Sequence, residues 1–277
     1  MYKYYNELLD KIKTRTTNFS YGKTFLLQDL FAFKIQPNNS INNKFKLLIQ
    51  GGIHSREWIT AFLCLKLIIY FTKYKEKLNC EVLIVPCSNL DGFQIACEGI
   101  KHLKKEYQDR LIQINKSEDF SLWKANFRAV DLNVNFDAGW GTGAKNVQIP
   151  SSENYIGPYP NSEIETINLI NLTNYFKPNF TISYHSKGEE IYSNFKNIKL
   201  INQDLFATIA KESTGYKVID LQNSAGGYKD YCIEKLKIPS LTIEVGSDDL
   251  SHPVSLENLE TIFNQNKDII FNLQKFL

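Results

Sequence analysis

The chain has 277 residues, of which 43% are hydrophobic and 22% are charged, and its formal net charge is +2. These values are typical of a soluble globular protein with a large core, and they give no electrostatic reason to expect binding to nucleic acid or a membrane. The five cysteines show no paired spacing, and the N-terminus lacks the apolar core of a signal peptide. We therefore expect a protein of the reducing cytoplasm. We also expect it to be a monomer.

Apolar runs alternate along the chain and predict strands and helices in turn. Strand-like patterns cover residues 25–35, 45–49, 81–85, 180–184 and 240–245. Helical patterns cover a short segment around Leu9 and residues 59–71, 98–119, 162–176, 202–213 and 255–276. Strands that alternate with helices predict a three-layer α/β/α fold around a central mixed twisted sheet, with residues 1–277 in a single domain.

Two local features refine this outline. The segment 59–71 is apolar nearly all round, which predicts a buried helix that is too short to span a bilayer. Ser162-Glu163-Ile164-Glu165 has the form of a capping box at a helix start. Residues 123–143 are rich in Asn, Asp and Gly and predict a long ordered loop, a kind of segment that often carries function.

The most informative stretch is Gly51-Gly52-Ile53-His54-Ser55-Arg56-Glu57-Trp58, directly after the predicted strand 45–49. The glycine pair permits a sharp turn. His54 and Glu57 then follow at the end of the strand, the edge at which open α/β sheets bind ligands. An imidazole and a carboxylate in this position are suited to a catalytic zinc. A histidine and a glutamate that only bond to each other at a helix start are the alternative.

Histidine occurs four times, and His54 and His185 each follow a predicted buried strand. With Glu57 they form the two-imidazole, one-carboxylate set of zinc hydrolases. Such an enzyme also needs a base, and Glu244 near the end of an apolar strand is placed for that role. A carboxylate paired with a lysine is the alternative for Glu244. We expect His102 on the surface and His252 in a loop.

Four motifs in a fixed order resemble the zinc metallocarboxypeptidases, the family of carboxypeptidase A. They are the Gly51–Trp58 stretch, Asp131-Leu132-Asn133, Ser183-Tyr184-His185-Ser186 and Thr242-Ile243-Glu244-Val245-Gly246. The resemblance runs from about residue 20 to the C-terminus. It implies a peptidase in which His54, Glu57 and His185 bind Zn²⁺ and Glu244 is the general base and acid.

The resemblance also implies catalytic roles for three positively charged residues. Arg56 matches the family arginine that polarises the scissile carbonyl or holds substrate. Lys124 occupies the position of the arginine that stabilises the oxyanion, although its ammonium is a point charge instead of a planar fork. Arg128, four residues further on, is the other candidate for this role, and the sequence leaves the choice open.

Three departures from the family pattern concern substrate. Val134 stands where the digestive enzymes have the arginine that binds the substrate's C-terminal carboxylate. Gln222 aligns with the family's substrate-capping tyrosine. Lys229 falls at the position that sets side-chain specificity, and a lysine there suits a substrate that carries a carboxylate. These departures therefore argue against an enzyme that removes C-terminal residues from ordinary peptides.

Several local sequences, including Trp123-Lys124-Ala125-Asn126 and Gly226-Gly227-Tyr228-Lys229-Asp230-Tyr231, are most similar to a bacterial branch of the family, the γ-D-glutamyl-diaminopimelate peptidases. This resemblance implies hydrolysis of peptidoglycan stem peptides, with a small peptide or muropeptide as substrate. We expect Asn133, Lys187, Tyr228 and Lys229 to bind it. A conventional zinc carboxypeptidase and a zinc-free wall-fragment binding protein of the same fold are the alternatives.

Overall fold

The computed structural model describes residues 1–37, 45–220 and 223–277. Its strands form one eight-stranded sheet in the order β1-β2-β4-β3-β5-β8-β6-β7. The strands are β1 (Thr17–Lys23), β2 (Asp29–Ile35), β3 (Lys46–Gln50), β4 (Glu81–Val85), β5 (Phe180–His185), β6 (Glu190–Tyr192), β7 (Lys217–Ile219) and β8 (Ser240–Glu244). The predicted mixed sheet is confirmed.

The four central strands, β4, β3, β5 and β8, are parallel to one another, whereas the β1–β2, β2–β4 and β6–β8 pairs are antiparallel. Parallel strands end at a common edge of the sheet. His185 and Glu244 are the last residues of β5 and β8, and they are register partners. The topology thus brings three separate motifs to one edge.

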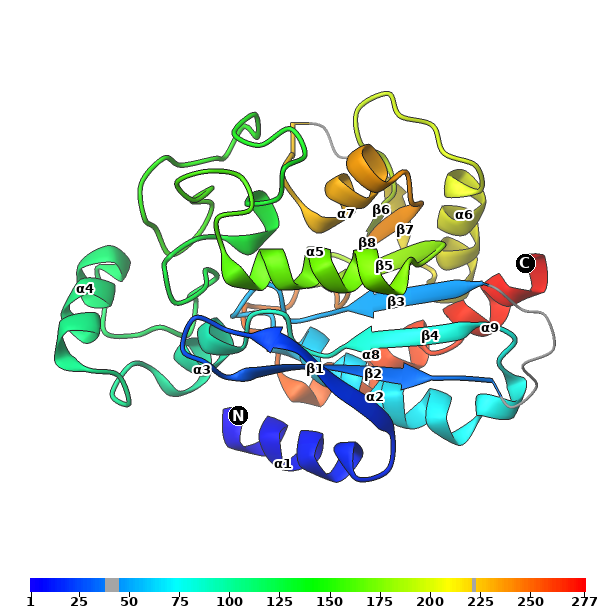
Figure 1. Ribbon diagram of the computed structural model, residues 1–277, viewed down its shortest axis with the longest axis horizontal. Coiled ribbons are helices and arrows are strands. Elements are labelled where there is room, and N and C mark those ends of the chain that lie inside the picture. Colours follow the sequence, from blue (N-terminus) through cyan, green and yellow to red (C-terminus); the bar gives the residue numbers. More distant parts are fainter. Residues whose placement is uncertain (38–44, 221–222) are drawn as a thin grey trace.

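Helices cover both faces of the sheet, which gives the expected three layers (Figure 1). Side chains of one group of helices pack on one face, and those of a second group pack on the other. The first group is α1 (Tyr2–Lys13), α2 (Trp58–Lys73), α3 (Leu90–Glu98), α6 (Gln203–Thr214), α8 (Leu259–Asn266) and α9 (Ile269–Leu273), and the second is α5 (Ile164–Phe176) and α7 (Tyr228–Tyr231). The helix α4 (Lys105–Asn115) lies at one end of the molecule (Figure 1).

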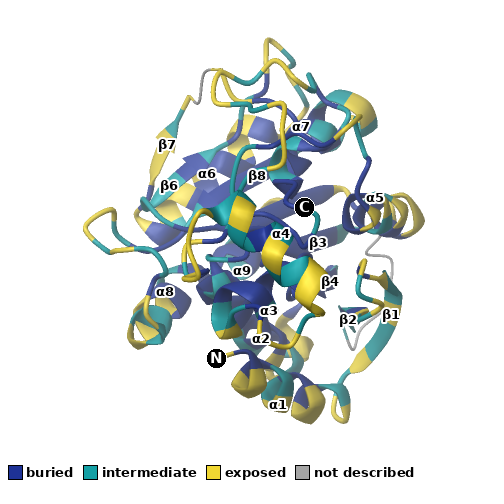
Figure 2. Cartoon of the chain, turned by 90° about the vertical axis from the view of Figure 1, so that its left-hand side faces the viewer, coloured by how far each residue is buried: buried dark blue, intermediate teal, exposed yellow. Residues whose placement is uncertain are grey.

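Strand β3 shows why the sequences of the central strands are continuous apolar runs. Leu47 and Ile49 face the core on the α2 side, and Leu48 faces the core on the α5 side. All three are fully buried. A strand with helices on both faces needs apolar residues at successive positions instead of alternate ones. Figure 2 shows the resulting pattern, with buried residues along the central strands and exposed ones on the outer faces of the helices.

Three expectations about secondary structure need correction. The polar strand β1 was not predicted, and the strand expected from residue 25 begins at Asp29. The capping box does not form, because Glu163 is the N-cap of α5 and Ser162 instead bonds to the Glu163 carboxylate. The long C-terminal helix is interrupted after Asn266, whose buried side chain bonds to the Tyr216 hydroxyl at 3.1 Å. The following helix, α9, packs against α6.

The helix expected over residues 98–119 is shorter, because Glu98 ends α3 and α4 spans only Lys105–Asn115. Other expectations hold. His102 is exposed and His252 lies in a loop, as predicted. All five cysteines are free. Within the described ranges, no helix combines the length and the apolar character that crossing a membrane requires.

Candidate metal and catalytic site

Two histidines and a glutamate meet at the carboxyl edge of the parallel strands. His54 and Glu57 lie in the turn after β3, and His185 ends the neighbouring strand β5. The Nδ1 atoms of the two histidines are 3.1 Å apart, and the Glu57 carboxylate lies 2.9 Å from His54 Nδ1 and 3.4 Å from His185 Nδ1. All three side chains are buried. The ligand atoms converge on one point, as the donor set of a catalytic zinc requires.

The glycine pair before His54 is required by close packing. A Cβ at Gly51 would lie 2.8 Å from the carbonyl oxygen of Thr60, in the first turn of α2. Gly52 has a φ of +60°, and a Cβ there would lie 2.9 Å from Cys87 Sγ. Strand β3 can therefore turn directly into the helix α2 only because both residues lack a side chain.

The far side of each imidazole has a polar neighbour. His54 Nε2 lies 3.2 Å from Asp131 Oδ1, and His185 Nε2 lies 3.1 Å from Ser183 Oγ. A proton on Nε2 leaves the Nδ1 lone pair of each ring directed at the shared centre. The backbone amide of Ser186 also donates to Glu57 Oε2 at 3.1 Å. Outer partners of this kind orient the ligands of protein zinc sites, and the positions of the three ligand side chains fit a zinc ion.

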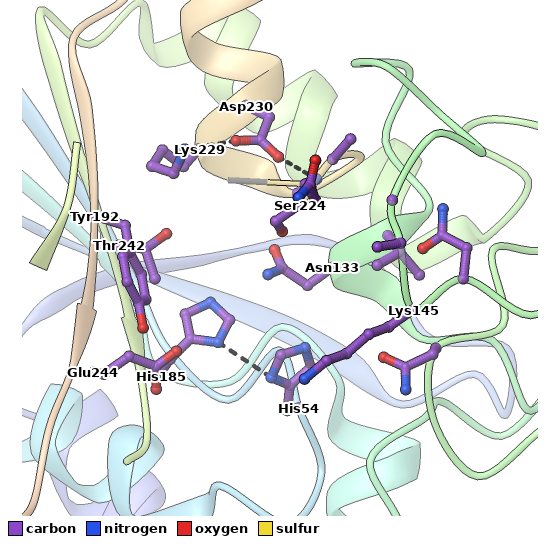
Figure 3. Close-up of a pocket in the computed structure, with 18 of the residues that line it drawn as sticks. His54, Asn133, Lys145, His185, Tyr192, Ser224, Lys229, Asp230, Thr242 and Glu244 are labelled. Atoms are coloured by element: carbon purple, nitrogen blue, oxygen red, sulfur yellow. Dashed lines mark hydrogen bonds and ion pairs between the residues drawn. The ribbon is translucent and has the colours of Figure 1, made fainter. Parts of the chain in front are cut away.

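Glu244 is half-buried at the end of β8 and lines the same cleft as His54 and His185 (Figure 3). Burial raises the pKa of its carboxyl group to about 8, with a further contribution from the nearby Glu57 carboxylate, whereas His185 and Lys124 act in the opposite sense. A cation held by the three ligands would also lower this pKa. A carboxylate in such surroundings is able to accept and return a proton near neutral pH.

The three candidate cations differ in position. Lys124 lines the cleft, and its ammonium lies 2.8 Å from Asp131 Oδ2. Arg56 extends to the Glu153 carboxylate at 3.1 Å, and Arg128 lies 3.4 Å from Glu163. Neither arginine is among the described residues that line the cleft. Of Lys124 and Arg128, Lys124 alone is among the described residues that line the cleft.

The cleft has a volume of about 510 Å³ and extends well beyond the histidines. Asn133 and Lys229 line it, as expected of substrate-binding residues, and so does Val134. Figure 3 shows Asn133 between the histidines at one end and Lys229 at the other. A substrate bound at the histidines therefore has room to extend toward Lys229.

A family model described as zinc carboxypeptidase matches residues 1–267. The chain belongs to the zinc carboxypeptidase family. Members of this family depend on zinc, and the His54, Glu57 and His185 cluster fits that metal. The protein is therefore a zinc metallopeptidase.

Among relatives of this zinc carboxypeptidase, γ-D-glutamyl-L-diamino acid endopeptidase 1 of Lysinibacillus sphaericus is 27% identical over 286 residues, which cover 94% of this chain and 69% of the relative. Human mast cell carboxypeptidase A is 26% identical over 168 residues, or 58% of this chain and 37% of that one.

Solved structures share the fold at lower identity. Bovine thrombin-activatable fibrinolysis inhibitor superimposes with a TM-score of 0.74 at 19% identity, covering 99% of this chain and 94% of that one. The murein-tripeptide amidase MpaA from Escherichia coli O157 gives a TM-score of 0.58 at 19% identity, with coverage of 92% and 90%. The α/β/α architecture is that of carboxypeptidase-like enzymes.

Two residues expected to bind substrate in this zinc carboxypeptidase lie elsewhere. Tyr228 is fully buried, and its hydroxyl lies 2.8 Å from Thr173 Oγ1 in the core between α7 and α5. Its ring is needed to fill the core beneath the cleft. Lys187 is paired with Asp248 at 2.9 Å and is not among the described lining residues. Gln222 lies outside the described residues.

Three charged residues of the site were not anticipated. Asp131 contacts both His54 and Lys124, and its place in the Asp131-Leu132-Asn133 motif was the available signal. Asp230 and Lys145 also line the cleft. Asp230 lies in the Gly226–Tyr231 motif, whereas none of the quoted motifs contains Lys145. In Figure 3 the Lys145 side chain extends from its loop toward the His54 end of the cleft.

Proposed function

We propose that the protein hydrolyses the amide bond between γ-D-glutamate and diaminopimelate in peptidoglycan stem peptides. The observation that carries this proposal is the similarity over 94% of the chain to a γ-D-glutamyl-L-diamino acid endopeptidase. The character of the cleft supports it. Val134 lines the cleft at the position where the digestive enzymes carry an arginine, and further along Lys229 and Asp230 introduce one charge of each sign. A substrate with charges beyond a single C-terminal carboxylate suits this lining.

We propose roles for the residues as follows. His54, Glu57 and His185 would hold zinc, which supplies Lewis-acid polarisation of a carbonyl and acidifies water. Glu244 takes the proton from the attacking water and returns it to the diaminopimelate nitrogen as the C–N bond breaks. Lys124 offers its charge to the developing oxyanion, and Asp131 holds Lys124 and the His54 ring in position.

The defining experiment uses the zinc-loaded protein with the tripeptide L-Ala-γ-D-Glu-meso-diaminopimelate and follows the products by mass spectrometry. Release of free diaminopimelate is expected, with loss of activity on chelation and recovery when zinc is returned. The matched control substrate is an ordinary tripeptide with α-linked L-residues. Cleavage of the control alone would contradict the proposal and identify a conventional carboxypeptidase.

A conventional carboxypeptidase is the second candidate, because the animal carboxypeptidases share the fold and the family. The zinc-free binding protein is disfavoured by the complete ligand set and by Glu244 beside it. Metal analysis of the purified protein separates these classes. We further propose that the enzyme acts as a monomer on soluble muropeptides, a location that cell fractionation tests.

A further inference from the structure

A row of buried polar side chains leads through the sheet to the candidate metal site. Gln50 is the last residue of β3, Ser183 is its register partner in β5, and Ser88 follows shortly after the end of β4. All three side chains are buried. Because β4, β3 and β5 are neighbouring parallel strands, these residues gather near the same edge of the sheet as the candidate zinc ligands.

Hydrogen bonds join these side chains into one chain. Ser88 Oγ donates to Gln50 Oε1 at 2.9 Å, and Gln50 Nε2 donates to Ser183 Oγ. Ser183 Oγ in turn lies 3.1 Å from His185 Nε2. Ser88 is itself held, because its backbone amide donates to the carbonyl oxygen of Gly51 at 3.1 Å. The chain therefore starts from fixed backbone and ends on an expected zinc ligand.

The chain limits the rotation of the His185 ring. Ser183 and His185 are two residues apart in β5, so their side chains project from the same face of the strand. The torsion that turns an imidazole ring about its bond to Cβ has broad preferences, and it does not fix the ring by itself. The Ser183 hydroxyl supplies a fixed partner for Nε2. The bond from Gln50 keeps that hydroxyl in the rotamer that reaches the ring.

The two candidate histidine ligands differ in their outer partners. His54 Nε2 faces the Asp131 carboxylate, whereas His185 Nε2 faces the neutral hydroxyl of Ser183. A carboxylate partner raises the basicity of a metal-binding histidine. A neutral hydroxyl held by an amide orients the second ring without a second negative charge beside the metal.

Packing alone does not require an amide at position 50. Leu47, Leu48 and Ile49, which precede it in β3, are apolar and fully buried. A buried amide costs free energy unless both of its ends are hydrogen-bonded, and an apolar side chain avoids that cost. The Gln50 amide is bonded at both ends, and one of its partners contacts His185. These contacts point to a role in the metal site.

We propose that Gln50 is a positioning residue of the metal site, which orients His185 through the hydroxyl of Ser183. Ser88 fixes the far end of the Gln50 amide, so the three side chains act as one unit. None of the three is among the described residues that line the cleft, and they affect the reaction through the metal site. The inference rests on the proposed zinc ligands and does not depend on which peptide bond is cleaved.

Competition with a chromophoric chelator measures the zinc affinity of each variant. Ser183→Ala removes the direct partner of His185 and is expected to weaken zinc binding by about 10- to 100-fold. Gln50→Met keeps the length of the side chain without its hydrogen bonds, and it is expected to weaken zinc binding by about three- to tenfold. Folded Gln50→Met protein with native zinc affinity would overturn the proposal.

The double variant tests whether Gln50 acts through Ser183. Once Ser183→Ala has broken the chain, the additional substitution Gln50→Met is expected to change the zinc affinity by less than about twofold. Losses that multiply in the double variant would mean that Gln50 affects the metal by another route, and the proposal would fail.

The matched control is Gln203→Met. Gln203 is buried and bonds to the backbone of Ser240 through both ends of its amide, at the end of β8 away from Glu244. This substitution should lower the free energy of unfolding of the metal-free protein while the zinc affinity stays native. An equal loss of zinc affinity in Gln203→Met and Gln50→Met would reveal a general effect of stability and overturn the proposal.

The Co²⁺-substituted proteins give a second readout. The visible absorption bands of Co²⁺ depend on the geometry of its ligands, so Gln50→Met should change them and Gln203→Met should not. If Gln50→Met folds poorly, Ser88→Ala frees the same amide from its far end and should also change the bands. Wild-type bands in whichever of these two variants is folded would overturn the proposal. A wild-type protein that binds no metal would instead overturn the ligand set itself.

Discussion

Asp131 Oδ1 lies 3.2 Å from His54 Nε2, on the side of the ring away from the other candidate zinc ligands. The second oxygen of the same carboxylate lies 2.8 Å from the Lys124 ammonium. Burial alone would raise the pKa of Asp131, but these two neighbours hold it well below its usual value. A single buried anion thus orients an expected zinc ligand and the expected oxyanion charge together.

Asp131→Asn is expected to weaken zinc binding by about 10- to 100-fold, because the amide no longer attracts the His54 Nε2 proton as a carboxylate does. Competition with a chromophoric chelator measures the affinity directly. Asp137→Asn is the control, since Asp137 pairs with Lys235 at a half-exposed site. An Asp131→Asn protein that retains native zinc affinity would show that the contact does not orient His54.

Glu244→Gln is expected to keep its zinc and to lose at least about a hundredfold in kcat, because glutamine cannot transfer the proton. Metal content and steady-state kinetics on the γ-D-glutamyl tripeptide test both parts. A variant with near-native turnover would remove Glu244 from the mechanism. A variant without zinc would mean that the carboxylate serves the metal site instead.

We expect Lys145 to affect the rate at which an anionic substrate associates with the cleft. It is exposed, it lines the cleft, and no carboxylate of the described residues pairs with it, whereas Lys124 and Lys229 each have an acidic partner. Lys145→Gln is therefore expected to lower kcat/KM for an anionic stem peptide by about three- to tenfold at low ionic strength, since charges at the rim of a site act mainly on association.

The salt dependence provides the check on this prediction. The difference between wild type and Lys145→Gln should shrink as salt is added, and the exposed Lys101→Gln, remote from the cleft lining, should show no such difference. A loss of activity in Lys145→Gln that does not respond to salt would contradict an electrostatic role.

The sequence predicted the whole ligand set, in which His54 and Glu57 are local in the chain and His185 is distant. Strand β4 was predicted with its observed bounds. His54 and Glu57 lie in one turn, and the glycines before them are needed because a Cβ there would collide with neighbouring atoms. That His185 joins them follows from the parallel pairing of β3 and β5. Strand pairing is a long-range property that an apolar run does not reveal.

The predictions that failed also depend on contacts between residues that are set by the fold. Lysine at position 229 by itself indicated an anionic ligand, but the fold buries it against Asp230, and the charge of the pair differs from that of either member. Tyr228 is polar in sequence and lies next to a cleft residue, yet it fills the core because successive residues of α7 face different sides. Likewise β1 is an edge strand whose half-exposed, polar residues lack the apolar signal of the central strands.

The last prediction concerns Glu165, which is buried in the first turn of α5. Burial raises the pKa of its carboxyl group to about 7, and the nearby Asp91 and Glu163 carboxylates add to this, whereas the Phe25 amide that donates to Oε1 at 3.3 Å acts in the opposite sense. The folded state therefore binds a proton more tightly than the unfolded state, in which the pKa is close to 4.5. By linkage, the free energy of unfolding falls as pH rises from about 5 to about 7.

The raised pKa of Glu165 lowers the free energy of unfolding by about 3 kcal/mol at neutral pH. Glu165→Gln removes the titration and keeps an oxygen for the Phe25 amide. The variant is expected to be the more stable of the two proteins above about pH 7, and the difference should diminish toward pH 5. Urea unfolding of both zinc-loaded proteins across this pH range measures it. A difference that grows toward acidic pH would mean that Glu165 is ionised in the folded state and stabilised by its neighbours.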